Sequence, residues 1–405
     1  MTRVGRFALL RSVAPMFSSR VPADLSPNAL AVAVERMRLA GRRFADLTVS
    51  NPTVAGIEYP PDLLAPLADS KALHYDPQPF GLPSARQAVA ADYARRGVRV
   101  PHSRVVLTAS TSEAYALLFK VLCDPGESVL VPTPSYPLFE HLTRLESVRA
   151  VPYRTEFHGT WTIDLDELRR LVDGSTRAVL VVSPNNPTGA WVRRDELRAL
   201  EMLCAEHDLA LISDEVFADY PIDPAPGAVA SVIDHEPESL SISLGGLSKT
   251  VGLPQLKLGW MALGGPPARV REALMRLEVA ADTYLSVATP VQLAADWLLR
   301  RGQVVREQIH RRVTSNYEAL RETAATAPWC QVLRAEGGWS AVLRIPHTMP
   351  EDERVIHLLE HEGVLVHPGF FFDFPREGYL VVSLLAHPDV FRPALERLVA
   401  AVGRS

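Results

Sequence analysis

Short apolar stretches alternate with longer helical patterns between about residue 80 and residue 265. The apolar stretches are rich in β-branched residues and most are followed by polar loops; they lie at 104–108, 128–131, 178–182, 210–213, 240–243 and 259–263. Helical patterns between them include 84–96 and 194–206. This alternation predicts βα units around a mostly parallel sheet. Ligands of such sheets bind beyond the carboxyl ends of the strands, so one site is expected from the loops at 109–112, 183–189, 214–217 and 246–257.

A second pattern follows this region. Residues 290–325 predict a long connector helix, and 332–343, 364–367 and 379–383 predict strands of a smaller α+β unit, which residues 20–70 are expected to join. A chain of 405 residues is long enough for two cores. We therefore expect an α/β fold with these parts: an amino-terminal arm (1–20), the amino-terminal part of a small domain (21–75), a large domain (76–290), and a connector helix with the rest of the small domain (291–405).

Composition and charge narrow the class of partner. The formal net charge of −5 gives no broad positive field for nucleic acid. Three cysteines lie far apart without a CxxC pair, which predicts a reduced compartment and no metal site. Apolar runs are too short to span a bilayer. We expect a cytoplasmic protein with a small-molecule partner. The basic segment 1–20 is expected to be a flexible arm, and the alternative is an organelle transit peptide.

A lysine stands in a glycine-rich loop directly after the strand expected at 240–243. Residues 243–260 read SLGGLSKTVGLPQLKLGW, and the neighbours of Lys249 are small enough to leave its amine accessible to a carbonyl carbon. Schiff-base chemistry also needs a partly deprotonated amine, which desolvation and the nearby cation of Lys257 favour. The alternative interpretation is a solvated surface lysine.

Further motifs stand after other predicted strands. Residues 183–189 (SPNNPTG) indicate a turn, and 212–217 (ISDEVF) place Asp214 at a strand end, where a helix cap is the alternative role. Residues 108–114 (TASTSEA) join a strand to a helix, whose amino-terminal amides and hydroxyls form a natural phosphate site. Tyr136, in Pro134-Ser135-Tyr136, is a further candidate for the site; the alternative interpretation is a tyrosine packed in the core.

Together these motifs resemble the class I/II pyridoxal-phosphate-dependent aminotransferases of fold type I, the aspartate aminotransferase-like family. The resemblance covers about residues 20–400 and depends on the ordered set Tyr75, Ser110, Tyr136, Asn186, Asp214 and Lys249. It implies a fold-type I large domain, pyridoxal 5′-phosphate held by Lys249 as an internal aldimine, and transfer of an amino group between an amino acid and a 2-oxo acid. It also implies a homodimer with shared sites, in which Tyr75 reaches the phosphate in the neighbouring subunit.

The resemblance assigns a role to individual residues. Asp214 would pair with the ring nitrogen and keep it protonated, and the freed Lys249 would move the substrate's α-proton. The other cofactor contacts it implies are Asn186 on the 3-oxygen, the stacked ring of Tyr136, and a phosphate site of Ser110, Thr111, Ser112 and Lys257. On the substrate side it implies Ser50, Asn51 and Trp339, for which ordinary loops and a strand start are the alternatives.

Several positions depart from the family pattern. Phe217 replaces a tyrosine whose hydroxyl meets the 3-oxygen, and Lys257 replaces a phosphate-binding arginine, so the bidentate fork is lost. Ser110 replaces the usual glycine of the family, and Gly246 stands where the family often has a serine. Val381 stands where the family has its substrate-carboxylate arginine; Arg376 and Arg344 are the nearby candidates to replace it.

These departures keep other reactions open. One alternative is a different pyridoxal-phosphate-dependent reaction on an amino acid, such as elimination, decarboxylation or cyclisation. Another is a regulatory domain that senses the cofactor, against which we note that residues 1–20 contain no basic DNA-binding domain.

Overall fold

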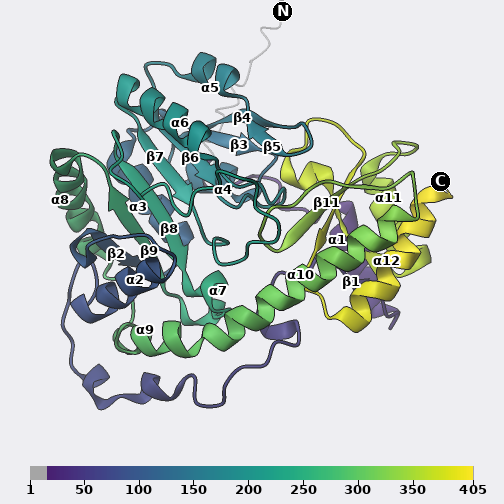
Figure 1. Cartoon of the computed structure of the whole chain (residues 1–405), viewed down its shortest axis with the longest axis horizontal. Coiled ribbons are helices and arrows are strands. Elements are labelled where there is room, and N and C mark those ends of the chain that lie inside the picture. Colours follow the sequence, from purple (N-terminus) through teal and green to yellow (C-terminus); the bar gives the residue numbers. More distant parts are fainter. Residues whose placement is uncertain (1–15, 405) are drawn as a thin grey trace, which may run out of the picture.

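The computed structural model describes residues 16–404 and has an eight-stranded sheet at its centre (Figure 1). The strand order is β2-β9-β8-β7-β6-β3-β4-β5. Neighbours from β8 to β4 run parallel, whereas β9 and β5 are antiparallel to their neighbours. The bounds are β2 (Val105–Thr108), β3 (Ser128–Thr133), β4 (Arg149–Phe157), β5 (Trp161–Ile163), β6 (Thr176–Val182), β7 (Ala210–Asp214), β8 (Ser241–Gly246) and β9 (Gly259–Gly264). The predicted α/β class with a mostly parallel sheet is confirmed.

Both faces of this sheet are buried, which explains the continuous apolar runs in its strands. In β6, Val179 and Val181 belong to one core, and Ala178, Leu180 and Val182 belong to a second core on the opposite face. Helices cover each face: α2 (Pro83–Arg95), α6 (Arg194–His207) and α9 (Thr289–Arg301) on the first, and α3 (Thr111–Leu122), α4 (Leu138–Leu145) and α8 (Pro267–Tyr284) on the second. The short helices α5 (Leu165–Leu171) and α7 (Leu247–Thr250) complete this part.

The connector predicted over 290–325 is two helices. α9 ends at Arg301 and α10 (Gln303–Ala325) begins after Gly302. A Cβ at position 302 would lie 2.5 Å from the Leu298 carbonyl oxygen and 2.7 Å from the Val251 side chain. The chain therefore needs glycine where the two helices meet. From there α10 runs to the second unit (Figure 1).

The second unit contains a four-stranded sheet of order β10-β11-β14-β13. Its strands are β10 (Gln331–Val332), β11 (Ser340–Arg344), β13 (His367–Pro368) and β14 (Tyr379–Ser383), and helices α11 (Glu351–His357) and α12 (Pro388–Gly403) belong to the same region. The strand predicted over 379–383 is confirmed. The strand predicted over 332–343 is confirmed only at its ends, in β10 and β11; it is wrong over residues 333–339, which form a mostly buried loop that passes through Gly337 and Gly338.

The amino-terminal segment lies beside the carboxyl-terminal strands (Figure 1). After α1 (Ala29–Leu39), β1 (Ala45–Asp46) pairs in parallel with β12 (Val364–Leu365). The amide of Ser383 also donates a hydrogen bond to the Leu47 carbonyl oxygen, 2.7 Å away. The two ends of the chain are thus joined at one place, whereas the exact domain boundaries stay a prediction.

Two predictions concern the chain as a whole. In residues 16–404, none of the helices combines the length and the apolar character that crossing a membrane requires. The arm predicted for residues 1–20 lies mostly outside the described residues.

Candidate active site

A cavity of about 370 Å³ lies where the carboxyl ends of the central strands meet the second unit. Its volume falls within the range of small-molecule sites. It brings together many of the residues singled out in the sequence: Ser50, Ser110, Thr111, Ser112, Tyr136, Asn186, Asp214, Phe217, Lys249, Lys257 and Trp339. The loops after β2, β6, β7 and β8 thus converge as the alternating pattern predicts.

Lys249 lies in α7, the short helix that follows β8. The Tyr220 hydroxyl donates a hydrogen bond to the Lys249 carbonyl oxygen at 2.5 Å, which fixes the backbone of this turn. Its Nζ lies 4.9 Å from the ring centre of Trp339 and 5.7 Å from that of Phe217. Burial lowers the pKa of Lys249, and the charge of Asp214 opposes this effect. The amine is therefore nearer to its neutral, nucleophilic form than a surface lysine.

Asp214 is the last residue of β7, and each of its two carboxylate oxygens accepts one hydrogen bond. The Val216 amide donates to Oδ1 at 3.1 Å, and the Tyr115 hydroxyl donates to Oδ2 at 3.0 Å. Burial raises the pKa of Asp214, whereas these two donors and Lys249 lower it. Tyr115 was missed in the sequence, although its position four residues after Thr111 puts both on one face of α3.

The first turn of α3 forms a corner of the cavity whose groups are suited to an anion. Ser110 caps the helix by accepting a hydrogen bond from the Glu113 amide at 3.2 Å, and Thr111 and Ser112 follow at its amino terminus. A helix amino terminus carries a partial positive charge with free amides. Lys257 also lines the cavity. Together these groups can hold a phosphate.

Gly259 allows this corner to pack closely against the sheet. It pairs with Thr108 on one side and with Gly246 on the other. A Cβ at position 259 would lie 2.9 Å from the Ser110 carbonyl carbon and 3.0 Å from the Thr111 amide nitrogen. Since these are backbone atoms, a larger residue here would displace the helix start.

An aromatic wall and an amide line the middle of the cavity. The ring of Phe217 packs edge-on against Trp339, with centroids 5.4 Å apart. Asn186, in the loop after β6, accepts a hydrogen bond on Oδ1 from the Ser340 hydroxyl at 3.0 Å. Ser340 was also missed; it begins β11, so its approach depends on how the second unit packs on the first. Tyr136 lines the cavity with about half of its surface exposed.

The far end of the cavity is formed by the second unit and the amino-terminal segment. Val381 lines this end, as do Thr48, Ser50, His367 and Ser383. None of the lining residues in the described part of the chain is an arginine. Val381, which replaces the family's carboxylate-binding arginine, thus lines the cavity itself. His367 was not among the residues singled out in the sequence.

Four expected or candidate residues do not line this cavity. The Asn51 side chain instead accepts hydrogen bonds from the amide and hydroxyl of Thr53, at 3.1 Å and 2.8 Å. Arg376 donates to the Tyr379 hydroxyl at 3.2 Å, and it is therefore not the replacement arginine in this arrangement. The second candidate, Arg344, is exposed at the end of β11. Tyr75 is exposed in a separate depression, so the role expected for it in a neighbouring subunit stays a prediction.

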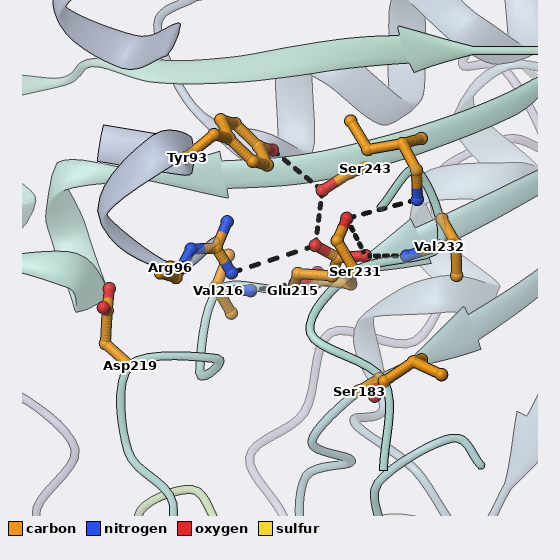
Figure 2. A network of polar contacts seen from close by, with 12 residues as sticks. Tyr93, Arg96, Ser183, Glu215, Val216, Asp219, Ser231, Val232 and Ser243 are labelled. Atoms are coloured by element: carbon orange, nitrogen blue, oxygen red, sulfur yellow. Dashed lines mark hydrogen bonds and ion pairs between the residues drawn. The ribbon is translucent and has the colours of Figure 1, made fainter. Parts of the chain in front are cut away.

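A buried polar network surrounds Glu215, the residue that follows Asp214 in the sequence (Figure 2). Glu215 accepts hydrogen bonds from the hydroxyls of Ser243 at 2.6 Å and Ser231 at 2.9 Å, and from the Val232 amide at 2.9 Å. Burial raises the pKa of Glu215, and the hydrogen bonds lower it. Buried carboxylates with this many donors fix the elements that supply them.

Helix α2 supplies the rest of this network. Arg96, just past the end of α2, has a guanidinium nitrogen 3.9 Å from the Glu215 carboxylate, and Tyr93 shares a 2.8 Å hydrogen bond with Ser243 (Figure 2). The strand β7 that ends in Asp214 is thereby tied to β8, which leads to Lys249. The network thereby helps to position Asp214 and Lys249, although its own side chains do not line the cavity.

Comparisons with known proteins agree with this geometry. The family described as "Aminotransferase class I and II" matches residues 44–398. The chain is 27% identical to the glutamate-pyruvate aminotransferase of Escherichia coli, covering 90% of this chain and 91% of that protein. It is 28% identical to the alanine aminotransferase of Mycobacterium tuberculosis, covering 90% and 86%. A solved aminotransferase structure from Escherichia coli superposes with a TM-score of 0.84 at 26% identity, covering 96% and 98%.

Proposed function

The chain belongs to the class I and II aminotransferases, and we propose that Lys249 and Asp214 carry its chemistry with pyridoxal 5′-phosphate as cofactor. It is a transaminase of fold type I, an enzyme that moves an amino group between an amino acid and a 2-oxo acid. The observation that carries the proposal is that a buried amine and a buried carboxylate, whose charges act on each other, line one cavity together with the start of α3, which is suited to an anion.

The residues present fit this cofactor. Lys249 lines the cavity, and burial lowers the pKa of its amine, which favours the nucleophilic form that condensation with an aldehyde requires. Asp214 can pair with a pyridine nitrogen, since its two hydrogen bonds and the charge of Lys249 favour the anion against the cost of burial. The start of α3 with Lys257 can hold the phosphate, Asn186 and Tyr136 can contact the ring, and Phe217 offers a ring without a hydroxyl.

When bound, the cofactor supplies an aldehyde that condenses with amino groups and a ring that accepts the electrons of a broken bond. Lys249 Nζ, freed by the substrate amine, would accept the proton from the substrate α-carbon and return it to the cofactor's C4′ carbon, on the other side of the shared nitrogen. Asp214 would pair with the ring nitrogen and hold it in its protonated form. The aromatic wall of Phe217 and Trp339 excludes water from the side of Lys249.

Borohydride reduction tests the proposal directly. Protein loaded with pyridoxal 5′-phosphate should carry a reduced covalent label on Lys249 alone; the chain has three other lysines, Lys71, Lys120 and Lys257. Incubation with an amino acid should convert the cofactor to pyridoxamine phosphate, and a 2-oxo acid should reverse this. No label on Lys249 would overturn the cofactor assignment. Labelled protein that instead releases ammonia or carbon dioxide would favour the alternative of another pyridoxal-phosphate-dependent reaction.

We also propose a homodimer in which Tyr75 completes the phosphate site of the partner. What supports this is that Tyr75 is 70% exposed and lies outside its own chain's cavity. Substituting Tyr75→Phe should weaken cofactor binding without changing the mass of the assembly in light scattering. A cytoplasmic location and the four-part domain division remain predictions of the same proposal.

A further inference from the structure

We propose that His367 is the residue that receives the carboxylate of the substrate, in place of an arginine. This inference rests on the proposed transaminase function, because it names the recognition group of that same site. His367 thereby becomes a residue that determines which amine-bearing compounds the enzyme accepts.

Strand pairing directs His367 into the cavity. β13 and β14 are antiparallel, and His367 is the direct cross-strand partner of Val381. Side chains at paired positions lie on the same face of a sheet. Both residues line the cavity. His367 can therefore donate a hydrogen bond to a ligand in the part of the cavity beside Val381, whose apolar side chain cannot.

Packing holds the imidazole and selects its donor atom. The His367 ring lies edge-on to Phe372 and tilted to Phe371, each with centroids 5.8 Å apart. Its Nδ1 is enclosed and has no hydrogen-bond partner within residues 16–404. An enclosed donor without a partner is costly, so the proton of the neutral ring belongs on Nε2. That nitrogen is then the available donor for a ligand.

The charges of the cavity leave a carboxylate few other partners. Among the described lining residues, the lysines Lys249 and Lys257 belong to the cofactor end, and His367 is the remaining side chain that can carry positive charge. A carboxylate taken out of water needs charged or hydrogen-bonding partners. His367 can supply a hydrogen bond from its Nε2–H, which suffices as a partner for one carboxylate oxygen.

The nearby hydroxyls are mostly engaged. Thr48 donates its hydroxyl hydrogen to the Asp46 carboxylate at 2.6 Å, and Ser383 donates its own to the Val49 carbonyl oxygen. Ser50, which also lines this end, is left to assist. Burial lowers the pKa of His367, and the charge of Asp46 only partly opposes this effect, so the neutral ring with its Nε2–H donor is the favoured form.

The test compares a carboxylate with an alcohol in the same position. The amino acid that best converts the loaded enzyme is measured against the amino alcohol of the same side chain, using kcat/KM for cofactor conversion. In His367→Phe, kcat/KM for the amino acid should fall by about 10- to 100-fold, the loss expected for a hydrogen bond to a charged group. For the amino alcohol it should change by less than about threefold. His367→Gln, which keeps a donor, should recover part of the loss.

A second measurement is independent of turnover. The dissociation constant of propionate, an unreactive carboxylate, should rise in His367→Phe by a similar factor, measured by calorimetry on the loaded enzyme. Val381→Arg added to His367→Phe should restore binding, since the two positions are paired. His158→Phe, at an exposed histidine, is the matched control and should change neither quantity. His367→Leu repeats the test if the phenylalanine variant does not fold.

The outcomes separate this inference from the proposed function. The His367→Phe variant can still label on Lys249 and convert its cofactor. If its ratio of kcat/KM for the amino acid and the amino alcohol is then unchanged, and its dissociation constant for propionate is also unchanged, the role of His367 alone is overturned. Absence of both labelling and conversion in the unsubstituted enzyme would overturn the proposed function itself.

Discussion

The hydroxyl of Tyr115 donates a hydrogen bond to the carboxylate of Asp214 across 3.0 Å. Burial alone would raise the pKa of Asp214 and favour its neutral form. The Tyr115 donor counteracts this, because hydrogen bonds to the anion stabilise it. A residue outside every recognised motif thus helps to maintain the charge of the proposed ring-nitrogen partner.

Removal of this donor should therefore slow catalysis without abolishing it. Tyr115→Phe should lower kcat/KM by about 10- to 100-fold, the loss of one hydrogen bond to a charged group. Asp214→Asn should lower it further, by about 10²- to 10³-fold or more, as for loss of an electrostatic partner of the reacting system. Asp208→Asn, in an exposed ion pair with Arg269, is the control and should have little effect. Equal losses in Tyr115→Phe and Asp208→Asn would contradict the role of Tyr115.

The buried amine of Lys249 should destabilise the protein when no cofactor is bound. Because burial lowers its pKa below the ordinary 10.5, the unfolded chain binds this proton more readily than the folded one. Stability is then fully present above pH 10.5 and decreases as the pH falls through the interval down to the lowered pKa. Cofactor-free Lys249→Met should melt at a higher temperature than the unsubstituted protein at neutral pH, with a difference that shrinks toward pH 10.5. Lys71→Met, at an exposed lysine, should show no such dependence.

Lys257 should contribute to cofactor affinity through its charge. Lys257→Met should raise the dissociation constant of pyridoxal 5′-phosphate by about 10- to 100-fold, measured by equilibrium dialysis, because a charge-assisted hydrogen bond is lost. Lys257→Arg keeps the charge and should remain within a few-fold of the original value. A dissociation constant unchanged in Lys257→Met would place the phosphate elsewhere.

Gly259 should tolerate no side chain. Gly259→Ala would force a Cβ to within 2.9 Å of the backbone at Ser110, so we expect a loss of about 1–3 kcal/mol in the free energy of unfolding. It should also weaken phosphate binding, since the start of α3 must shift. Gly174→Ala is the matched control, because its Cβ would meet no atom within 4 Å. Similar denaturation midpoints for the two variants would contradict this account.

The network behind the site should be important for stability. Ser243→Ala removes a donor from Glu215 and a partner from Tyr93, both buried. We expect a loss of about 1.5–3 kcal/mol in the free energy of unfolding by chemical denaturation. Ser70→Ala, at an exposed serine, should be nearly neutral. The prediction fails if the two variants unfold at the same denaturant concentration.

The sequence predicts the central sheet well because both of its faces are buried, which leaves continuous apolar runs bounded by polar loops. The same signal misleads over 332–343, where Leu333 and Trp339 are buried in a loop rather than a strand. Burial and strand pairing cannot be told apart from apolar residues alone. The glycines at 337 and 338 were the available warning.

For the site, local motifs identify residues that their own strand end presents, such as Lys249 and Asp214. They miss Ser340 and His367, which approach the cavity only because distant segments pair. They also misplace Asn51, which lies next to a lining residue but turns away because its local hydrogen bonds are satisfied first.

The pairing of β1 with β12 has a consequence for the order in which the protein is made. Ala45 has to remain without its strand partner until Val364 has been synthesised, and the wall that holds Val381 and Ser383 follows later still. Domains form during synthesis from the amino terminus onward. The start of α3 and the Lys249 turn are therefore synthesised well before the end of the cavity where we propose that the substrate carboxylate binds. A nascent chain cut short of β14 would have the proposed catalytic amine without the wall that holds Val381 and Ser383.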